Sequence, residues 1–475
     1  MGRPEARMLN DFLYLMNAEL LVTLIIFILL FLKLSNEEWK NEGLLNFINF
    51  LLLINLAAGF FYIPNGNLFG DMFHTSELVT FEKNLLNLGT LIISLQSHDW
   101  LKTHKHVAEF YILLLSTLLG MFFMISANNL LMFYLGLELS TIPLAALSNF
   151  DLEKRRSSEA AFKFIISSAF SSGLLLFGIS MLYGATGTLN FMGIKAHLNG
   201  NSFQVFSFIL LLAGFGFKIS AVPFHLWTAD VYEGSPVAVT SYLSVISKGA
   251  VLFVMISIFY NVFTPIADSW YNMIFLISVA TMIIGNLFAL RQQNMKRFLA
   301  FSSIAQIGFI LVGLSAQSTA GSSSVIFFIL IYIFSNLGAF GVISLVSAVK
   351  GKENMDDYRG FYKTNPVLSW VLAISLFSLA GIPPMAGFFG KFFLLFAGAG
   401  KGNYSLIIIA ALNMVVSLYY YLKVIKIMFM DANEHPLEKI KTHWQPKIAM
   451  ALCVGGILVT GIASGAYNYI HSLLK

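Results

Sequence analysis

The chain has 475 residues, of which 57% are hydrophobic and only 11% charged, and its mean hydropathy is +0.77. This composition excludes an ordinary soluble domain and indicates a polytopic membrane protein. The single cysteine, Cys453, excludes a disulfide framework and leaves no cysteine set for an iron–sulfur cluster or a structural zinc site. No GxGxxG or GxxxxGK[ST] stretch is present, so we expect no nucleotide or flavin site on this chain. We also expect no metal site.

Apolar segments of roughly 20 residues, the length that crosses a bilayer, recur along the whole chain. They lie at 10–34, 44–63, 78–98, 107–126, 128–148, 157–184, 203–222, 237–260, 268–290, 298–318, 323–349, 366–399, 403–430 and 447–471. We therefore predict an all-α fold of about fourteen transmembrane helices. The first segment follows two arginines, as a signal peptide would, but it contains Asn17 and Glu19 and lacks a cleavage pattern. We expect it to be a retained helix.

The basic residues fall mainly into alternate connections between these segments. One side collects Lys33, Lys40, Lys102, Lys105, Lys154, Arg155, Arg156, Arg291, Lys296, Arg297, Lys350, Lys352, Arg359, Lys363 and the basic residues from Lys423 to Lys447. The other side has Arg3, Arg7, Lys195, Lys401 and Lys475. The positive-inside rule places the first set in the cytoplasm and both termini outside. The net charge of +5 is thus explained by the basic residues on the cytoplasmic side of the membrane, and no nucleic-acid partner is expected.

Two apolar segments contain helix breakers in their deepest part. The first reads AGFGFK at 213–218 and is followed by Pro223, and the second reads AGIPP at 380–384. Such backbone survives in a membrane only where it faces protein or water. Each break occupies the fourth place in a run of five spans, and an odd number of spans inverts the second run. We predict an N-terminal three-helix segment (1–106), a first five-helix repeat (107–260), a second, inverted repeat (261–430) and a C-terminal helix (431–475).

Four charges lie inside long apolar runs, where each costs on the order of 3 kcal/mol. Glu138 has no basic residue within reach on its own helix, so it needs a cation from another helix, and Lys218 is the natural partner. A purely structural ion pair is the alternative. Lys248 and Lys391 have no local acid, and a buried lysine that loses its charge can accept and release a proton. In membrane proteins such groups usually mark a proton or ion path.

Three further residues have competing interpretations. Lys163 lies near the cytoplasmic end of its helix with Glu159 four residues before it, which suits a structural or a functional role equally. Lys83 lies near the outer end of its span, and we expect its side chain to extend to the interface. His225 lies in a predicted cytoplasmic loop at 223–236, where it either passes protons inward or only forms structural hydrogen bonds.

Several motifs carry a resemblance to a known family. They are PFHLWTADVYEGSPVAVT, the preceding GFGFKISAVP, LGLELSTIPLAALSNF, and SSEAAFKFIISSAFSSGLLLFGISMLYGATGTLNF. These strings resemble the antiporter-like subunits of respiratory complex I over spans four to thirteen. GLEL, YGATG and Lys391 resemble the N-type branch, the counterpart of mitochondrial subunit 2. The chain departs from the family at Ala229, where proline is frequent, and this affects only the rigidity of the loop.

The resemblance implies a fourteen-helix fold with inverted repeats and a role in redox-linked proton translocation. It implies Glu138 and Lys218 as a coupled pair, Lys248 as the central relay, Lys391 in the exit half, Lys163 as a further member, and His225 at the cytoplasmic entrance. NADH, FMN, iron–sulfur clusters and quinone would be bound by partner subunits and no cofactor by this chain.

The implied partners are adjacent antiporter-like and small membrane subunits and the peripheral arm, in a bacterial inner membrane. One rival reading is a subunit of a multisubunit Na⁺/H⁺ antiporter, which shares the broken-helix lysines. The GLEL and YGATG strings and lysine rather than glutamate at 391 argue against it. A non-transporting membrane scaffold is the other rival, and the cost of several buried charges weighs against it.

Overall fold

In a computed structural model the chain folds almost entirely into helices, with one small hairpin. The structure describes residues 4–35, 39–402, 404–463 and 465–475, with the backbone alone for 4–9. The N-terminal part contains α1 (Pro4–Leu15), α2 (Asn17–Leu34), α3 (Asn41–Phe61), β1 (Gly66–Leu68), β2 (Phe73–Thr75), α4 (Glu77–Gln96) and α5 (His98–Leu101). The two strands pair antiparallel, with Asn67 opposite His74.

Two sets of long helices follow. The first contains α6 (Val107–Ile125), α7 (Leu130–Ser148), α8 (Arg155–Thr186), α9 (Phe191–His197), α10 (Ser202–Ile219), α11 (Leu226–Gly234), α12 (Val237–Tyr242), the π-helical segment η1 (Leu243–Ser247) and α13 (Lys248–Asn261). The second contains η2 (Thr264–Ile266), α14 (Ala267–Ala289), α15 (Met295–Ser315), α16 (Thr319–Lys350), η3 (Met355–Tyr358), α17 (Phe361–Thr364), α18 (Pro366–Ala380), α19 (Ala386–Ala399) and α20 (Tyr404–Phe429). The chain ends with α21 (Trp444–Ile462) and α22 (Gly465–Leu473).

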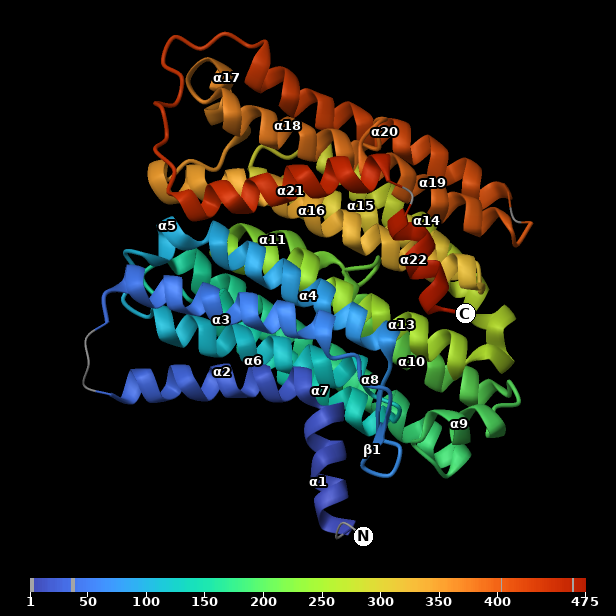
Figure 1. The fold of residues 1–475 in the computed structure, drawn as a ribbon. Helices are drawn as coiled ribbons and strands as arrows, with labels where there is room; N and C mark the ends of the chain where they lie inside the picture. The colour runs from blue at the N-terminus through green and yellow to red at the C-terminus, as the bar shows by residue number, and fades with distance from the viewer. Residues whose placement is uncertain (1–3, 36–38, 403, 464) are drawn as a thin grey trace.

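The predicted spans are recovered. In the described part of the chain, 13 helices are long and apolar enough to cross a membrane, and the shorter apolar helices α18 and α19 together occupy the predicted span at 366–399. Two boundaries were wrong. The expected helix at 10–34 divides at Met16, and α1 points away from the bundle (Figure 1), while the expected helix at 447–471 ends at Ile462.

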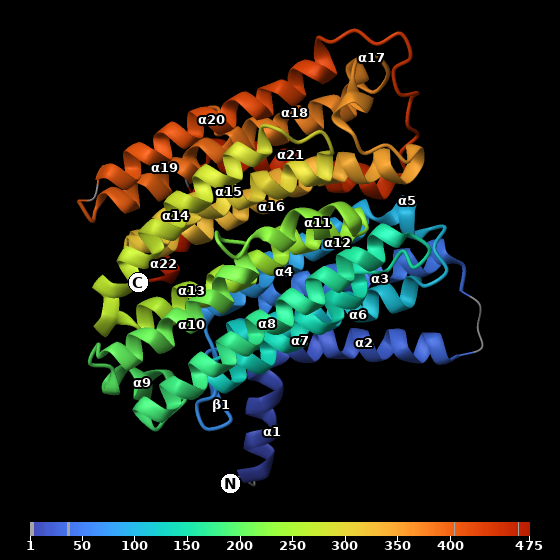
Figure 2. The same cartoon turned by 180° about the vertical axis from the view of Figure 1, so that it is seen from behind.

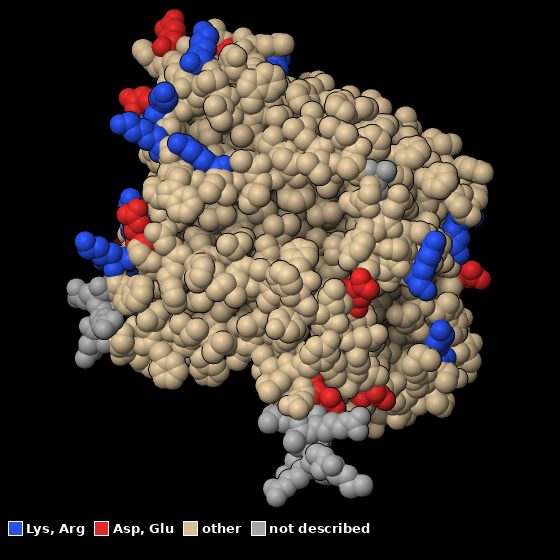
Figure 3. Space-filling view, viewed as in Figure 1, with Lys and Arg blue, Asp and Glu red and all other residues tan. Residues whose placement is uncertain are grey.

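The two sets form two layers that pack along a common seam, seen from both sides in Figures 1 and 2. The seam holds the most enclosed helices: α15 is buried at every residue except Arg297, and α12–α13 and α16 are nearly as enclosed. In contrast, α2, α3 and α20 bury only about a third of their length or less, as expected for helices that face lipid or neighbouring subunits. Lysine and arginine gather at the left end of the molecule in Figure 3.

Both predicted breaks exist, and they share one construction. Each helix ends at a residue in the left-handed region, Ser220 after α10 (φ +63°) and Gly381 after α18 (φ +86°). Each is followed by a cis proline bond, at Val222–Pro223 and at Pro383–Pro384. The first break differs from expectation because α10 stays helical through 213–219 and unwinds only at Ser220. The expected loop that follows is also largely helical, as α11.

Other features recur in the two sets. The third long helix, α8 in one set and α16 in the other, has 32 residues in both cases and ends at a left-handed glycine, Gly187 or Gly351. The second helix is capped by an asparagine side chain in both sets, Asn129 for α7 and Asn294 for α15. An asparagine oxygen satisfies the free N–H groups of a first helical turn. The two sets are thus built alike although their sequences differ.

Candidate functional site

Glu138 lies on α7, half-buried, with one carboxylate oxygen enclosed and without a hydrogen-bond partner in the described part of the chain. No lysine or arginine nitrogen of the described residues lies within 4.0 Å of this carboxylate. The expected partner, Lys218, instead donates hydrogen bonds to Thr141 Oγ1 and, at 3.1 Å, to Ser168 Oγ. Thr141 follows Glu138 by one turn of α7, so Lys218 contacts the helix of Glu138 without contacting its carboxylate.

Lys248 lies where the two sets of helices meet. It begins α13, directly after the π-helical segment η1, and its side chain is almost fully buried. Its Nζ donates a hydrogen bond of 2.8 Å to Ser303 Oγ on α15 and lies 5.5 Å from the centre of the Tyr232 ring on α11. A lysine of the first set therefore has its hydrogen-bond partner in the second set.

A polar face of α15 continues from Ser303 toward the second break. The adjacent Ser302 shares a hydrogen bond of 2.5 Å with the Tyr421 hydroxyl, and Gln306 Nε2 donates to the same hydroxyl at 3.0 Å. Gln306 Nε2 also donates to the Leu379 carbonyl oxygen at 3.0 Å.

Lys391 completes this row of polar groups. Its Nζ donates to the same Leu379 carbonyl at 2.8 Å and to the Ala380 carbonyl at 3.3 Å, and it lies 4.8 Å from the centre of the Phe309 ring. Both carbonyls belong to the last turn of α18, which the break leaves without helical N–H partners. Side chains of α15 thus reach both lysines, Ser303 by bonding Lys248 and Gln306 by sharing the Leu379 carbonyl with Lys391. The sequence did not single out Ser303, Gln306 or Tyr421, because polar side chains of these types are common in membrane helices.

Lys163 belongs to a separate group of charges at the basic end of the molecule. It forms the expected ion pair with Glu159 at 2.7 Å and a second one, also at 2.7 Å, with Asp230 on α11. Arg297 on α15 binds Asp230 at 2.6 Å and Glu233 at 3.0 Å. The sequence analysis noted Asp230 as part of the motif at 223–236 and Arg297 as one of the basic residues on the cytoplasmic side. Their ion pair could not be predicted, because it joins two helices that only the fold brings together.

His225 lies directly before α11, at the first break. Its Nδ1 is buried and has no hydrogen-bond partner among the residues that the structure describes. The imidazole therefore lies at the N-terminus of α11, the helix that carries Asp230 and Tyr232. Within the described part of the chain, it forms no hydrogen bond with a buried lysine.

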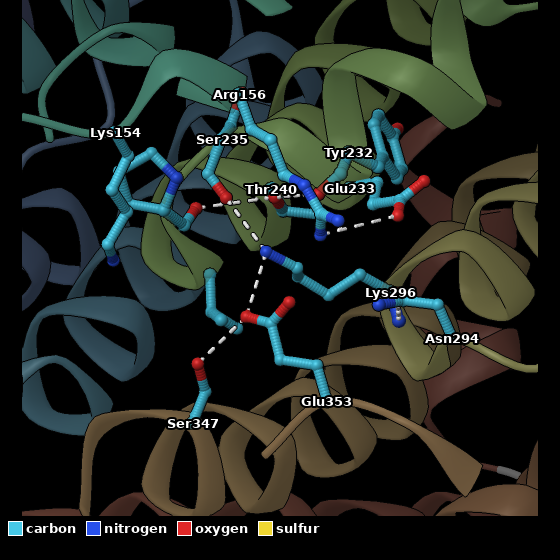
Figure 4. Close-up of polar contacts among 12 residues, drawn as sticks. Lys154, Arg156, Tyr232, Glu233, Ser235, Thr240, Asn294, Lys296, Ser347 and Glu353 are labelled. Atoms are coloured by element: carbon cyan, nitrogen blue, oxygen red, sulfur yellow. Dashed lines mark hydrogen bonds and ion pairs between the residues drawn. The ribbon is translucent and has the colours of Figure 1, made fainter. Parts of the chain in front are cut away.

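A cavity of about 350 Å³ enters between the two sets at this basic end. Its lining includes Trp100, Asp151, Lys154, Arg156, Lys296 and Glu353. Lys296, only 4% exposed, lies 3.0 Å from Glu353 Oε1 and donates to the Ser235 carbonyl at 3.2 Å (Figure 4). The sequence predicted only that Lys296 lies on the cytoplasmic side of the membrane. Its burial follows from the packing of the two sets of helices.

Lys83 is not interfacial, contrary to expectation. Its side chain is 3% exposed and its Nζ lies 2.6 Å from Glu19 Oε1 on α2. The rings of Phe73 and Phe122 lie 5.3 and 5.8 Å from the same nitrogen. The side chain does not extend to the surface because α2 provides a carboxylate at the same depth and the hairpin strand β2 covers it.

Comparisons with known proteins agree with one another. The family model described as NADH:quinone oxidoreductase/Mrp antiporter, TM, matches residues 127–417. The chain is 46% identical to NADH-quinone oxidoreductase subunit N of Phocaeicola vulgatus, over 96% of this chain and 97% of that protein. A chain of respiratory complex I from Thermus thermophilus superposes with a TM-score of 0.81 at 27% identity, covering 94% and 97% of the two chains. A chain of the Mrp complex from Dietzia sp. shares the fold, with a TM-score of 0.78 at 20% identity and 98% coverage of both.

Proposed function

The chain belongs to the NADH:quinone oxidoreductase/Mrp antiporter family of membrane proteins, and on that premise we propose that it is a proton-translocating subunit in the membrane arm of an NADH:quinone oxidoreductase. The observation that carries the proposal is the row of buried lysines, hydroxyls and carbonyls from Lys218 and Lys248 to Lys391. Lysine donors and hydroxyl groups are the side chains that exchange protons along a hydrogen-bonded path. Electron transfer from NADH to quinone takes place in partner subunits, which bind the FMN and iron–sulfur clusters.

The proposed mechanism uses Glu138 as an electrostatic switch. A carboxylate brought to about 4 Å from the Lys218 ammonium, at an effective dielectric constant near 20, stabilises the charge by about 4 kcal/mol. That energy corresponds to a factor of roughly 1,000 in proton affinity. When Glu138 approaches, Lys218 holds its proton; when Glu138 withdraws, Lys218 releases it toward Lys248. The proton then passes by way of Ser303 on α15 and the Tyr421 hydroxyl on α20, which Gln306 orients by a hydrogen bond, to Lys391 and the outer side.

Protons enter at the basic end. The cavity beside Lys296 and Glu353 brings water to the seam between the two sets of helices. Lys163 and Asp230 supply exchangeable charges at the base of α11, and His225 lies directly before this helix, next to them in the chain's path from the first break.

The test measures proton ejection and NADH oxidation together in proteoliposomes that contain the assembled complex. We expect Lys218→Ala and Glu138→Ala to eject fewer protons per NADH oxidised, to a similar degree, because each removes one partner of the same switch. Lys105→Ala removes an exposed lysine at the basic end and serves as the control. Unchanged proton ejection in both variants would contradict the mechanism.

A subunit of an Mrp-type antiporter is the second candidate, because that fold is shared. The two differ in their partners: the first requires flavin and iron–sulfur proteins, and the antiporter does not. Copurification of the affinity-tagged chain from its native membrane decides between them. We expect flavin and iron–sulfur proteins to accompany it.

We further propose that the two sets of helices are inverted repeats within a bacterial inner membrane, with both termini on the outer side. The shared asparagine caps, the 32-residue third helices and the left-handed residue that ends each broken helix, Ser220 or Gly381, support this arrangement. An experimental structure in which spans four to eight superpose on spans nine to thirteen by a two-fold axis in the membrane plane is the expected result.

A further inference from the structure

Three metal-ligating side chains meet at the basic end, away from the lysine row. Glu42 from the start of α3, His98 from α5 and His443 from the segment before α21 each place one ligand atom within 4.8 Å of the others. The three residues are far apart in the sequence, so only the folded chain assembles them. Neighbouring hydrogen bonds hold the same segments together, from Asn41 to the His104 carbonyl at 2.8 Å and between Asn46 and Gln445.

His98 has the features of a ligand prepared for a metal ion. Its side chain is completely buried, and its Nδ1 faces Asp99 Oδ1 at 3.2 Å. Its Nε2 is enclosed and has no hydrogen-bond partner in the described part of the chain. A carboxylate on one imidazole nitrogen fixes the tautomer and leaves the other nitrogen as the ligand, as in many metal sites. A buried imidazole nitrogen without a partner is otherwise unfavourable.

The other two ligands have a separation that suits a metal ion. His443 Nε2 lies 3.4 Å from Glu42 Oε1, and its ring stacks on that of His98 with the centres 4.1 Å apart. Metal–ligand bonds of about 2.0–2.1 Å at tetrahedral angles separate two ligand atoms by about 3.3 Å. For tetrahedral coordination the third ligand atom, at up to 4.8 Å, would move closer by up to about 1.5 Å when the ion binds.

We propose that Glu42, His98 and His443 bind a zinc ion, with water as a fourth ligand. Two imidazoles and one carboxylate form a set that zinc accepts in tetrahedral sites. The cysteine count had led us to expect no structural zinc, but this set needs no cysteine. Lys102, 3.8 Å from the second Glu42 oxygen, remains outside the set and partly balances the carboxylate. The ion joins the N-terminal three-helix segment to the C-terminal helix α21, and this role is independent of proton translocation.

The experiment measures zinc by mass spectrometry in the purified complex, normalised to flavin, after exposure to zinc chloride and removal of the excess. Glu42→Gln and His443→Gln alter partly exposed side chains, so both variants are expected to assemble. Each should lose about one zinc per complex. His435→Gln removes an exposed histidine of the same connecting segment and should lose none.

His98→Gln tests the buried ligand directly, and it is informative wherever the variant complex assembles. X-ray absorption at the zinc edge should show that the zinc lost in the variants had nitrogen and oxygen neighbours at about 2.0–2.1 Å. Equal zinc content in the unsubstituted complex, Glu42→Gln and His443→Gln overturns the proposal. Because zinc content is the readout, a failure here is distinct from a failure of the proton-translocation proposal.

Discussion

Lys218 and Lys391 lie beside equivalent breaks but have different hydrogen-bond partners. Lys218 faces the hydroxyl groups of Thr141 and Ser168, which both donate and accept. Lys391 faces two carbonyl oxygens, which only accept. The two lysines therefore differ in their surroundings: Lys218 bonds to groups that can also donate a hydrogen bond, and Lys391 bonds only to acceptors.

The buried pair of Glu19 and Lys83 provides a test of stability at the residue scale. Lys83→Met removes one partner and leaves a buried carboxylate without its cation, which should cost about 3–5 kcal/mol. Glu19→Leu combined with Lys83→Met removes both charges and should recover most of the loss. The measurement is the thermal midpoint of the purified complex. A single variant as stable as the unsubstituted complex would show that the pair is not buried there.

At the scale of elements, two glycines allow the helices of the site to lie very close together. A Cβ atom on Gly120 of α6 would lie 2.4 Å from the Ser140 backbone nitrogen of α7. A Cβ atom on Gly285 of α14 would lie 2.6 Å from the Ala305 backbone nitrogen of α15. These helices carry Glu138 and Ser303, so the two close approaches fix the positions of residues on either side of the seam.

Gly120→Ala should therefore displace α7 and lower both the stability of the complex and the number of protons ejected per NADH. Overpacking of this kind typically costs about 1–3 kcal/mol. Gly184→Ala is the matched control, because a Cβ atom at Gly184 of α8 meets no atom within 4 Å. The control should be neutral or stabilising by up to about 1 kcal/mol, since alanine favours a helix. Thermal midpoints and proton ejection of the two variants are compared, and equal behaviour would contradict the close approach.

At the scale of the whole molecule, hydropathy was sufficient to predict where the transmembrane spans lie, because the length of an apolar run is a local property of the sequence. The second break was also predictable, since glycine and two prolines at 381–384 end a helix locally. Lys83 was misplaced because its partner, Glu19, lies on another helix and no local pattern reveals it. The same reason hid the contacts of Ser303 and Gln306, which depend on packing of α15 between the two sets.

The orientation of the whole chain can be tested by cysteine labelling, because Cys453 is the only cysteine and is buried. In a Cys453→Ala background, Ser472→Cys and Lys105→Cys place one exposed thiol at each end of the bundle. A membrane-impermeant maleimide should label Ser472→Cys in intact cells stripped of their outer membrane, and Lys105→Cys only in inverted vesicles. The parent without cysteine controls for background, and the reverse pattern would invert the proposed topology.

The burial of α15, at every residue except Arg297, has a mechanical consequence. Other helices enclose α15 on all sides, and their side chains are closely packed against it. When the two layers move relative to each other, the contacts on the surface of α15 therefore have to change. The bond of 2.8 Å between Lys248 and Ser303 is one of these contacts. A displacement that lengthens it by about 1 Å takes it beyond hydrogen-bond range and would interrupt the proposed proton route. Proton transfer between Lys248 and Ser303 would then be switched on or off by a small movement of the layers, and would not change gradually with it.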